Sequence, residues 1–318
     1  MKIAILNDYQ RAVPTLASFA KAAGHSVEIF SDAERDEAKL AARLADFDAI
    51  ILIRERTRMT ASLLAKLPKL KLLVQTGSAG PHIDLAACRS RGVTVCAGGG
   101  SPVAPAELTW ALILAALRHL VPEAERLKRG QWQGHLGRVV AGRRLGMVGF
   151  GKIAKLVGRY AAAFDMKVTV WGRESTLARA REAGLATTES MPELFAACDV
   201  VSAHLRLNDS TRGMIKLEHL AAMRPDALFV NISRAELVEP GALERALRNG
   251  RPGYAAIDVF EGEPVYDAAQ PLLAMPNVLA TPHIGFVEKD TYESYFSEAF
   301  DAVNAFAAGN PIRVVKQG

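Results

Sequence analysis

The second half of the chain places three ionisable residues just after apolar stretches. Arg234 follows "FVNIS", Glu263 follows "IDVFEG", and His283 ends "NVLATPH". An arginine holds a carboxylate with its planar guanidinium, an imidazole exchanges a proton near neutral pH, and a carboxylate beside the ring orients it and favours its charged form. Taken alone, His283 fits a packed histidine at the end of a strand. Together the three residues predict acid–base chemistry on an anionic substrate.

A glycine-rich turn precedes these residues. The apolar run "LGMVGFG" leads into the helical pattern "KIAKLVGRYAAAF", which gives Gly149-x-Gly151-x-x-Ala154. In such turns the first glycine permits a tight bend, the second lets a pyrophosphate approach, and the alanine lets the helix pack closely. Free amides at the start of the helix, at Lys152 and Ile153, would then bind the anion. We predict a dinucleotide site, with a turn that serves packing alone as the alternative.

The residues after the next apolar stretch bear on which dinucleotide binds. An acidic residue about 20 positions beyond the glycines normally accepts the ribose hydroxyls of NAD. Here the sequence is Trp171-Gly172, then Arg173 and Glu174. Arg173 can pair with the 2′-phosphate of NADP, whereas Glu174 keeps NAD open. We expect a slight preference for NADP, with an exposed turn arginine as the alternative.

Two alternating series of apolar strands and amphipathic helices must position these residues. The first series has strands at 2–8, 25–30, 48–54, 70–77 and 93–98, with helices at 60–67 and 84–91. The segment "GGGSPVAPAE" (98–107) breaks the pattern like an interdomain crossing and leads into an apolar helix at 107–120. The second series has strands at 144–151, 167–172, 199–205, 227–233, 254–260 and 277–284, and a helix at 289–309 closes the chain.

Continuous apolar strands between helices are typical of parallel sheets covered on both faces. We therefore predict an α/β fold of two doubly wound parallel-sheet domains with a cleft between them. Arg234, Glu263 and His283 each follow a strand of the second series. Because ligands bind at the carboxyl edge of such sheets, the three side chains can converge although they are distant in sequence.

Composition narrows the class of protein. The 318 residues carry a net charge of +5, but 39 basic residues mix with 34 acidic ones and form no basic stripe, so we expect small anionic substrates rather than nucleic acid. Apolar runs are too short for a membrane span, and Asp8 interrupts the N-terminal run where a signal peptide would continue. Cys88, Cys96 and Cys198 form neither a disulfide framework nor a zinc pattern. We predict a cytoplasmic protein without a metal.

Several stretches resemble the D-isomer-specific 2-hydroxyacid dehydrogenases, a family that includes phosphoglycerate dehydrogenase and glyoxylate/hydroxypyruvate reductases. The similar stretches are "LIRERTRMT" (52–60), "TGSAGPHIDLAA" (76–87), "AELTWALILAALR" (106–118), "GRRLGMVGFGKIA" (142–154), "DVVSAHLRLNDSTRGMI" (199–215) and the three segments around the ionisable residues. The resemblance implies hydride transfer between a nicotinamide cofactor, NAD or NADP, and a 2-oxo or 2-hydroxy acid.

The resemblance also implies roles for particular residues. Arg234, Glu263 and His283 take the catalytic roles, and Asp258 holds the nicotinamide carboxamide. Our predicted cofactor site, which also draws on the glycine turn and the basic residues themselves, further includes Gly149, Gly151, Lys152, Ile153, Arg173, His204, Arg206 and Ile232. The predicted substrate site includes Arg54, Gly77, Ser78, Ala79 and Gly80. In the mechanism so implied, Arg234 and the 76–80 loop hold the substrate carboxylate, and His283, kept cationic by Glu263, donates a proton to the oxygen.

The family architecture adds domains and a partner. It implies a flavodoxin-like substrate domain over 1–98 and 286–318, a Rossmann domain over 99–285, and a homodimer formed through the nucleotide domains. Helix 107–120, apolar almost all round, fits that interface; a helix buried within one subunit is the alternative. The chain ends soon after its closing helix, so we expect no regulatory domain.

Some residues depart from the family pattern. Ala235 and Ala79 stand where glycine is usual, and Arg206 replaces a usual proline; it could support Arg173 on a 2′-phosphate or lie in a surface loop. Formate dehydrogenases carry Gln at the position of Glu263, which argues against that activity, whereas related corepressors that bind dinucleotides remain an alternative. Arg54, Arg56 and Arg58 favour a phosphorylated or dicarboxylic substrate, with two solvated arginines among the three as the alternative. Glyoxylate, hydroxypyruvate and 3-phosphohydroxypyruvate therefore all stay open as substrates.

Overall fold

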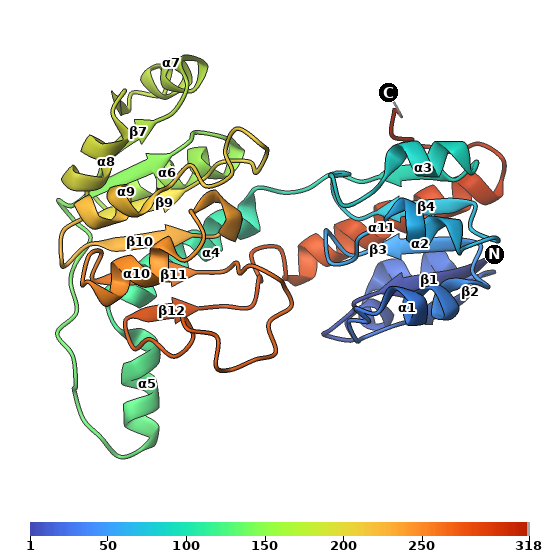
Figure 1. Ribbon diagram of the computed structural model, residues 1–318, viewed down its shortest axis with the longest axis horizontal. Coiled ribbons are helices and arrows are strands. Elements are labelled where there is room, and N and C mark those ends of the chain that lie inside the picture. Colours follow the sequence, from blue (N-terminus) through green and yellow to red (C-terminus); the bar gives the residue numbers. More distant parts are fainter. Residues whose placement is uncertain (317–318) are drawn as a thin grey trace. The chain divides into compact units, whose positions relative to one another are not determined.

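The computed structural model describes residues 1–316, which form two compact units (Figure 1). One unit combines Met1–Ser101 with the residues from Val287 onward, and the other comprises Pro102–Phe286. The crossings thus lie at 101 and 286, where the sequence suggested 98 and 285. The first crossing falls inside the glycine- and proline-rich segment, where the local sequence favours neither helix nor strand.

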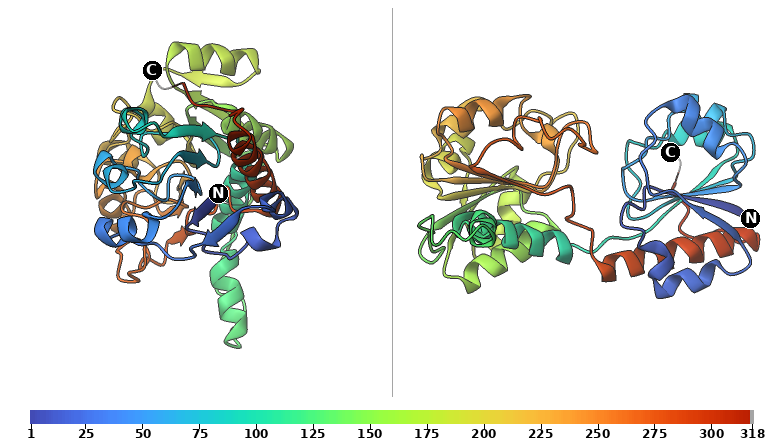
Figure 2. Two further views of the ribbon diagram at one scale, coloured as in Figure 1. Left: turned by 90° about the vertical axis from the view of Figure 1, so that its right-hand side faces the viewer. Right: turned by 90° about the horizontal axis from the view of Figure 1, so that it is seen from below.

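Within the described residues, the first unit contains a parallel sheet of five strands in the order β2-β1-β3-β4-β5. The strands are β1 (Lys2–Leu6), β2 (Ser26–Ile29), β3 (Ala49–Leu52), β4 (Leu72–Gln75) and β5 (Thr94–Ala97). The helices are the short η1 (Val13–Thr15) and η2 (Ala17–Ala22), then α1 (Glu37–Leu44), α2 (Ala61–Ala65), α3 (Leu85–Ser90) and α11 (Lys289–Ala307). Figure 2 shows α11 and the η2 region on one face of this sheet and other helices on the opposite face. The strand order and the two covered faces are those of a flavodoxin-like fold.

The second unit contains a parallel sheet of seven strands, counted over the same residues, in the order β12-β11-β10-β9-β6-β7-β8. The strands are β6 (Arg144–Val148), β7 (Lys167–Trp171), β8 (Ala186–Thr188), β9 (Val200–Ala203), β10 (Leu228–Asn231), β11 (Tyr254–Ile257) and β12 (Val278–Ala280). The helices are α4 (Val103–Leu117), α5 (Leu120–Lys128), α6 (Lys152–Ala163), α7 (Glu174–Glu182), α8 (Met191–Ala197), α9 (Leu217–Ala222), η3 (Ala235–Leu237) and α10 (Ala242–Arg248). The predicted fold class, two doubly wound parallel sheets, is confirmed.

Two apolar cores sandwich the second sheet. Helices α4 and α6 pack on one face around Trp110, Met147 and Val157. On the other face α8, α9 and α10 pack around Phe195 and Phe229. Strand order reverses between the neighbouring strands β6 and β9. From β6 the chain continues outward through β7 and β8, and from β9 it continues in the opposite direction through β10, β11 and β12. The carboxyl edge beside such a switch point is where dinucleotides bind.

The structure differs from the sequence prediction in places. Strand β8 was missed because "ATT" at the sheet edge has no apolar run to mark it. The helix predicted at 107–120 begins earlier, at Val103, and ends at Leu117, because His119 takes a left-handed φ of 51° and starts a new helix. Among the described helices none is by itself long and apolar enough to cross a membrane; α4 and α5 pass such a test only together, and they are bent by 61°.

Candidate active site and family

The three predicted catalytic residues follow three strands that lie next to one another in the second sheet. Arg234 comes after β10, Glu263 after β11 and His283 after β12. Because all three strands are parallel, these residues follow the same edge of the sheet. Asp258 stands at the first position after β11. The topology therefore delivers an arginine, two carboxylates and an imidazole to one edge.

Glu263 and His283 form a direct pair. The His283 Nδ1 lies 2.5 Å from Glu263 Oε2, while Glu263 Oε1 accepts a hydrogen bond from the Phe260 amide at 2.8 Å. The carboxylate is thus fixed by its own loop and in turn fixes the ring with Nδ1 as donor. In the described chain His283 Nε2 has no hydrogen-bond partner, and a quarter of the side chain is exposed. Nε2 is therefore the nitrogen left to exchange a proton with a ligand.

Asp258 holds the turn that presents His283. Its carboxylate accepts hydrogen bonds from the Thr281 hydroxyl at 2.6 Å and from the Ile284 and Gly285 amides, both at 2.8 Å. Burial raises the pKa of Asp258, and these donors oppose the rise. A Cβ on Gly285 would lie 3.2 Å from the carboxylate, so glycine there permits the close approach.

This anchoring explains a strained backbone. His283 has a φ of 52°, a left-handed conformation that costs a non-glycine residue about 1–3 kcal/mol. The bonds from Asp258 to residues on both sides of His283 offset that cost. In the structure the Asp258 carboxylate bonds the turn that carries His283, which makes it a candidate positioning group for the imidazole. The contact with the nicotinamide that the resemblance implies for Asp258 stays a prediction.

We expect Asp258→Asn to lower both stability and turnover. An amide offers one acceptor where the carboxylate accepts three hydrogen bonds, and its NH₂ would face a backbone N–H, at a cost of about 1–3 kcal/mol. Urea unfolding and kcat report the two effects. Asp267→Asn, at an exposed aspartate of the following loop, is the matched control. An Asp258→Asn protein equal to wild type in both measurements would contradict the positioning role.

Arg234 is positioned by a buried asparagine that the sequence analysis did not single out. Asn231 ends β10, donates from Nδ2 to the Arg234 carbonyl at 2.9 Å and accepts from the Ser233 amide at 3.0 Å. The Ser233 hydroxyl donates to the Ala203 carbonyl at 2.8 Å, which ties the loop to β9. The sequence signal that could have identified Asn231 is a polar residue at the end of an otherwise apolar, buried strand. Ala235 has an ordinary negative φ as the first residue of η3, so this position needs no glycine.

The glycine turn fits a dinucleotide pyrophosphate. Gly149 has a φ of 96°, and a Cβ there would lie 2.8 Å from the His204 carbonyl oxygen. At Gly151, by contrast, a Cβ would meet no atom of the described chain within 4 Å, which leaves room for a ligand. Gly151 is also the N-cap of α6 and supplies no side chain to the first amides, at Lys152 and Ile153. Open space over uncapped amides is what an anion site requires.

His204 lies behind this turn with an unusual environment. Its Nε2 is 3.0 Å from the Ser202 hydroxyl, and its Nδ1 is buried without a hydrogen-bond partner in the described residues. Burial lowers the pKa of His204 to about 4, so the ring is neutral at physiological pH. Ile232, also predicted at the cofactor site, belongs to the core beside α4.

His204 should make stability depend on pH. Its pKa falls from 6.5 in the unfolded chain to about 4, so the native state binds fewer protons between these values. The free energy of unfolding therefore falls as pH drops from about 6.5 to 4, by at most about 3 kcal/mol. Urea unfolding of wild type and His204→Asn at pH 7 and pH 5 measures how much of the pH dependence of the free energy of unfolding comes from His204. Equal pH dependence in the two proteins would contradict it.

Charged residues follow both β7 and β9. Arg173 is the exposed N-cap of α7, and Glu174 pairs with Arg181 at 2.8 Å. Arg206 is exposed on the loop after β9, where its carbonyl accepts from the Thr211 hydroxyl at 2.7 Å. A joint role of Arg173 and Arg206 on a phosphate stays a prediction.

In the first unit, the predicted substrate residues lie after β3 and β4. Arg54 has a left-handed φ of 54°, and its Nη1 occupies the space in which a Cβ of Gly77 would stand. The Arg54 guanidinium lies 5.9 Å from the ring centroid of Tyr295, a residue of α11 that the sequence analysis missed. Burial raises the pKa of Tyr295, and Arg54 opposes this rise.

Gln75 and His82 support the rest of the 76–80 loop. Gln75 donates to the Thr76 carbonyl at 3.0 Å and is bonded to His82 at 2.9 Å. Ser78 is exposed, and a Cβ on Gly80 would lie 3.2 Å from His82 Nδ1. Ala79 packs its methyl group against the core and has no positive φ, so alanine fits where the family pattern has glycine.

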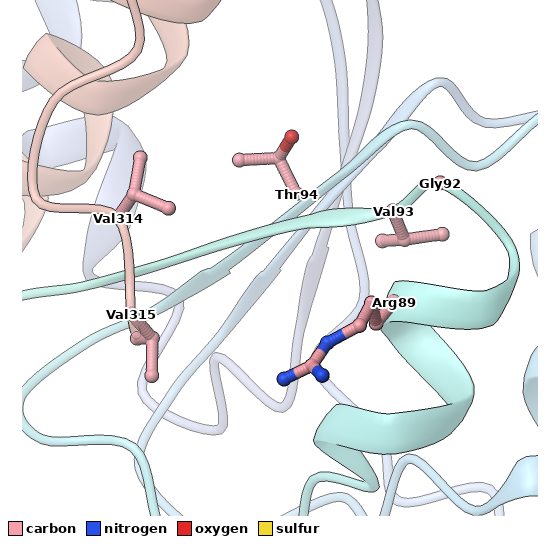
Figure 3. A pocket seen from close by; sticks show the side chains of 6 residues that line it. All are labelled: Arg89, Gly92, Val93, Thr94, Val314 and Val315. Atoms are coloured by element: carbon pink, nitrogen blue, oxygen red, sulfur yellow. The ribbon is translucent and has the colours of Figure 1, made fainter. Parts of the chain in front are cut away.

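A pocket lies in the first unit. Figure 3 shows a pocket of the first unit between the end of α3, the start of β5 and the C-terminal segment, lined by Arg89, Gly92, Val93, Thr94, Val314 and Val315. It contains no predicted site residue. Residues 1–316 hold no group of three or more His, Cys, Asp and Glu that could bind a metal ion.

Comparison with known proteins decides the family. Residues 110–285 match the model of the D-isomer specific 2-hydroxyacid dehydrogenase NAD binding domain. The chain belongs to this family. The match covers more than half of the chain and includes the glycine turn and all three predicted catalytic residues, so the resemblance noted in the sequence is confirmed.

The chain is similar to family members that are named for different activities. It is 34% identical over 262 residues to a D-3-phosphoglycerate dehydrogenase of Methanocaldococcus jannaschii, covering 81% of this chain and 49% of that enzyme. It is also 34% identical to a glyoxylate reductase of Aeropyrum pernix, covering 79% and 78%. The chain spans about half the length of the curated phosphoglycerate dehydrogenases it matches.

Solved structures share the whole fold of the family member. A phosphoglycerate oxidoreductase from Vibrio cholerae is 50% identical with a TM-score of 0.95, covering 97% of this chain and 99% of that one. A D-lactate dehydrogenase of Aquifex aeolicus, solved with NAD and lactic acid, is 27% identical with a TM-score of 0.77, covering 97% and 96%.

Proposed function

We propose that this chain catalyses reversible hydride transfer between a nicotinamide dinucleotide and C2 of a small 2-oxo or D-2-hydroxy acid. The observation that carries the proposal is the Glu263–His283 pair, at the carboxyl edge of a sheet whose glycine turn fits a dinucleotide. The relatives named above support this reaction type. A bound nicotinamide would supply or accept the hydride.

The chain's own residues would handle the proton and the carboxylate. In the reducing direction, protonated His283 donates from Nε2 to the substrate oxygen, while Glu263 holds Nδ1 and stabilises the cationic ring. Arg234 binds the substrate carboxylate, since a guanidinium matches its geometry. The 76–80 loop of the first unit, with Arg54, is our candidate for the remaining substrate contacts.

We further propose NADP as the preferred dinucleotide. Gly172 stands where NAD-selecting folds place an acid, and Arg173 follows it without an ion pair in the described residues. A cytoplasmic location, where thiols stay reduced, also remains our proposal and agrees with free, buried cysteines at 88, 96 and 198.

A panel of 2-oxoacids tests the reaction. Initial rates with glyoxylate, hydroxypyruvate, pyruvate and 3-phosphohydroxypyruvate, each with NADPH and NADH, give kcat/KM for every pair. We expect reduction of at least one of these acids, with NADPH favoured. Equal or better efficiency with NADH would remove the NADP proposal while leaving the reaction type intact.

We also propose a homodimer, formed through a surface that differs from the helix suspected in the sequence. Helix α4 buries Trp110, Leu112 and Ile113 within its own unit. Exposed apolar side chains gather instead on the arm formed by α5 and residues 131–139; they are Leu120, Val121, Leu127, Trp132, Leu136 and Val139. Leu136 is 96% exposed, and an apolar set of this kind is typical of association surfaces.

The double variant Trp132→Glu/Leu136→Glu should therefore shift the protein from dimer to monomer in sedimentation velocity, because four buried charges would face each other across a twofold interface. Ile312→Glu, which charges an exposed apolar position of the first unit, should leave the dimer unchanged. A wild-type monomer, or a dimer that survives the double change, would contradict this interface.

A further inference from the structure

The turn between β7 and α7 is closed to an acidic side chain at the position after the strand. A Cβ on Gly172 would lie 2.7 Å from Thr176 Cγ2 and 2.9 Å from Thr176 Cβ. Threonine is β-branched and stiff at χ1, and Thr176 is held in the first turn of α7, so it cannot easily rotate away. Gly172 has no positive φ, so its backbone would accept other residues. The exclusion is thus due to the Thr176 side chain.

The same threonine leads to an arginine beside the glycine turn. Arg179 Nη2 lies 3.3 Å from the Thr176 hydroxyl and 3.5 Å from the carbonyl oxygen of Phe150, which stands between Gly149 and Gly151. Both contacts are to neutral oxygens. Over residues 1–316 Arg179 forms no ion pair, so its positive charge is not neutralised by a carboxylate.

The acidic residue of the turn is engaged elsewhere. Glu174 pairs with Arg181 at 2.8 Å, while Arg173 is exposed and has no ion pair in the part of the chain that the structure describes. Two guanidinium groups without carboxylate partners therefore flank the end of the dinucleotide site that receives the adenosine ribose. A phosphate dianion pairs well with such groups, whereas a ribose hydroxyl offers them no charge.

We propose that Arg179 is a specificity-determining residue that binds the 2′-phosphate of NADP together with Arg173, and that Thr176 keeps an NAD-selecting carboxylate out of position 172. This inference rests on the proposed function for the use of a nicotinamide dinucleotide. It adds Arg179, a guanidinium other than the predicted Arg173 and Arg206, and a steric device at position 172 that the sequence pattern did not identify.

Binding of adenosine fragments tests the inference without turnover. Titrations of the intact protein with 2′,5′-ADP and 5′-AMP compare a ligand that has the 2′-phosphate with one that lacks it. Arg179→Ala should weaken 2′,5′-ADP about 10–100-fold, the effect of a lost charge-assisted contact, and leave 5′-AMP within about twofold. Arg159→Ala is the control, because it removes an exposed charge on α6 about 12 Å along the helix from its N-cap, Gly151. It should change the affinity for neither fragment.

The opposite change tests the role of Thr176. Gly172→Asp alone should weaken 2′,5′-ADP without improving 5′-AMP, because Thr176 blocks a productive position of the carboxylate. Gly172→Asp/Thr176→Gly, which removes both the Cγ2 and the Cβ of Thr176, should improve NADH and 5′-AMP binding at least about tenfold relative to the single variant. If Gly172→Asp alone gains that affinity, the steric role is wrong.

Two results separate this inference from the proposed function. Equal weakening of both fragments by Arg179→Ala would assign it to holding the glycine turn and would overturn the inference. Selective fragment binding in a protein that reduces no 2-oxoacid would support the inference and overturn the proposed reaction.

Discussion

His283→Gln should lower kcat for 2-oxoacid reduction by about 10²–10⁴-fold, the usual contribution of a positioned general acid. Glutamine keeps a polar side chain of similar reach but cannot donate a proton at a useful acidity. The ring contacts Glu263 through Nδ1 and the Phe286 ring edge-to-face, and neither residue belongs to the glycine turn, so its loss leaves that turn untouched. The Kd for the dinucleotide, measured by nicotinamide fluorescence, should therefore stay within about threefold of wild type.

The partner of His283 provides the graded comparison. Glu263→Gln should reduce kcat by a smaller factor than His283→Gln, because the ring remains but loses the carboxylate that orients it and stabilises its cation. The double variant should be hardly worse than His283→Gln, since the two residues act as one unit. Near-normal kcat in His283→Gln, with dinucleotide binding intact, would exclude His283 as the proton donor.

Arg234→Ala should reduce kcat/KM for the oxoacid by roughly 10²–10³-fold, mainly through KM. Truncating one partner of a desolvated charge pair costs about 2–5 kcal/mol, because the substrate carboxylate would lose its cationic partner. Arg234→Lys should recover only part of the loss, since an ammonium group lacks the planar fork of a guanidinium. Folding should be retained, because Asn231 holds the loop through main-chain atoms of Ser233 and Arg234.

An uncharged substrate isolates this interaction. With the amide of the same oxoacid, which has no carboxylate, wild type and Arg234→Ala should have kcat/KM values within about threefold. A loss of the same size on the acid and the amide would show that Arg234 acts on the carbonyl or on the fold rather than on the carboxylate.

Much of the site was predictable because the carboxyl ends of parallel strands share an edge. That rule alone, applied to the apolar runs before Glu263 and His283, predicts their proximity, and the structure places Nδ1 and Oε2 2.5 Å apart. The glycine turn was equally predictable, because Gly149 adopts a backbone conformation that favours glycine and Gly151 leaves space for a ligand. Strand β8 could not be predicted, because a short polar strand at the sheet edge lacks the apolar run that marks the other strands.

The supporting contacts could not be predicted because they join residues distant in sequence through specific rotamers. Asp258 reaches the 281–285 turn across more than twenty residues, and Tyr295 on the closing helix meets Arg54. Thr176 and Gly172 are close in sequence, yet only the folded backbone brings the Thr176 side chain into the space that a Cβ of residue 172 would occupy. Residue types indicate the chemistry, whereas the contacts that hold the catalytic side chains in place depend on the folded chain.

Transfer of deuterium from labelled dinucleotide to product tests the proposed reaction most directly. The protein is incubated with NADPH or NADH deuterated at C4 of the nicotinamide, on either face, and with each 2-oxoacid of the panel. The 2-hydroxyacid product is then separated by chiral chromatography and analysed by mass spectrometry. We predict deuterium at C2 of the D enantiomer from one labelled face. A protein that binds dinucleotide but forms no labelled 2-hydroxyacid from any member of the panel would contradict the account and favour a dinucleotide-binding role of the corepressor type.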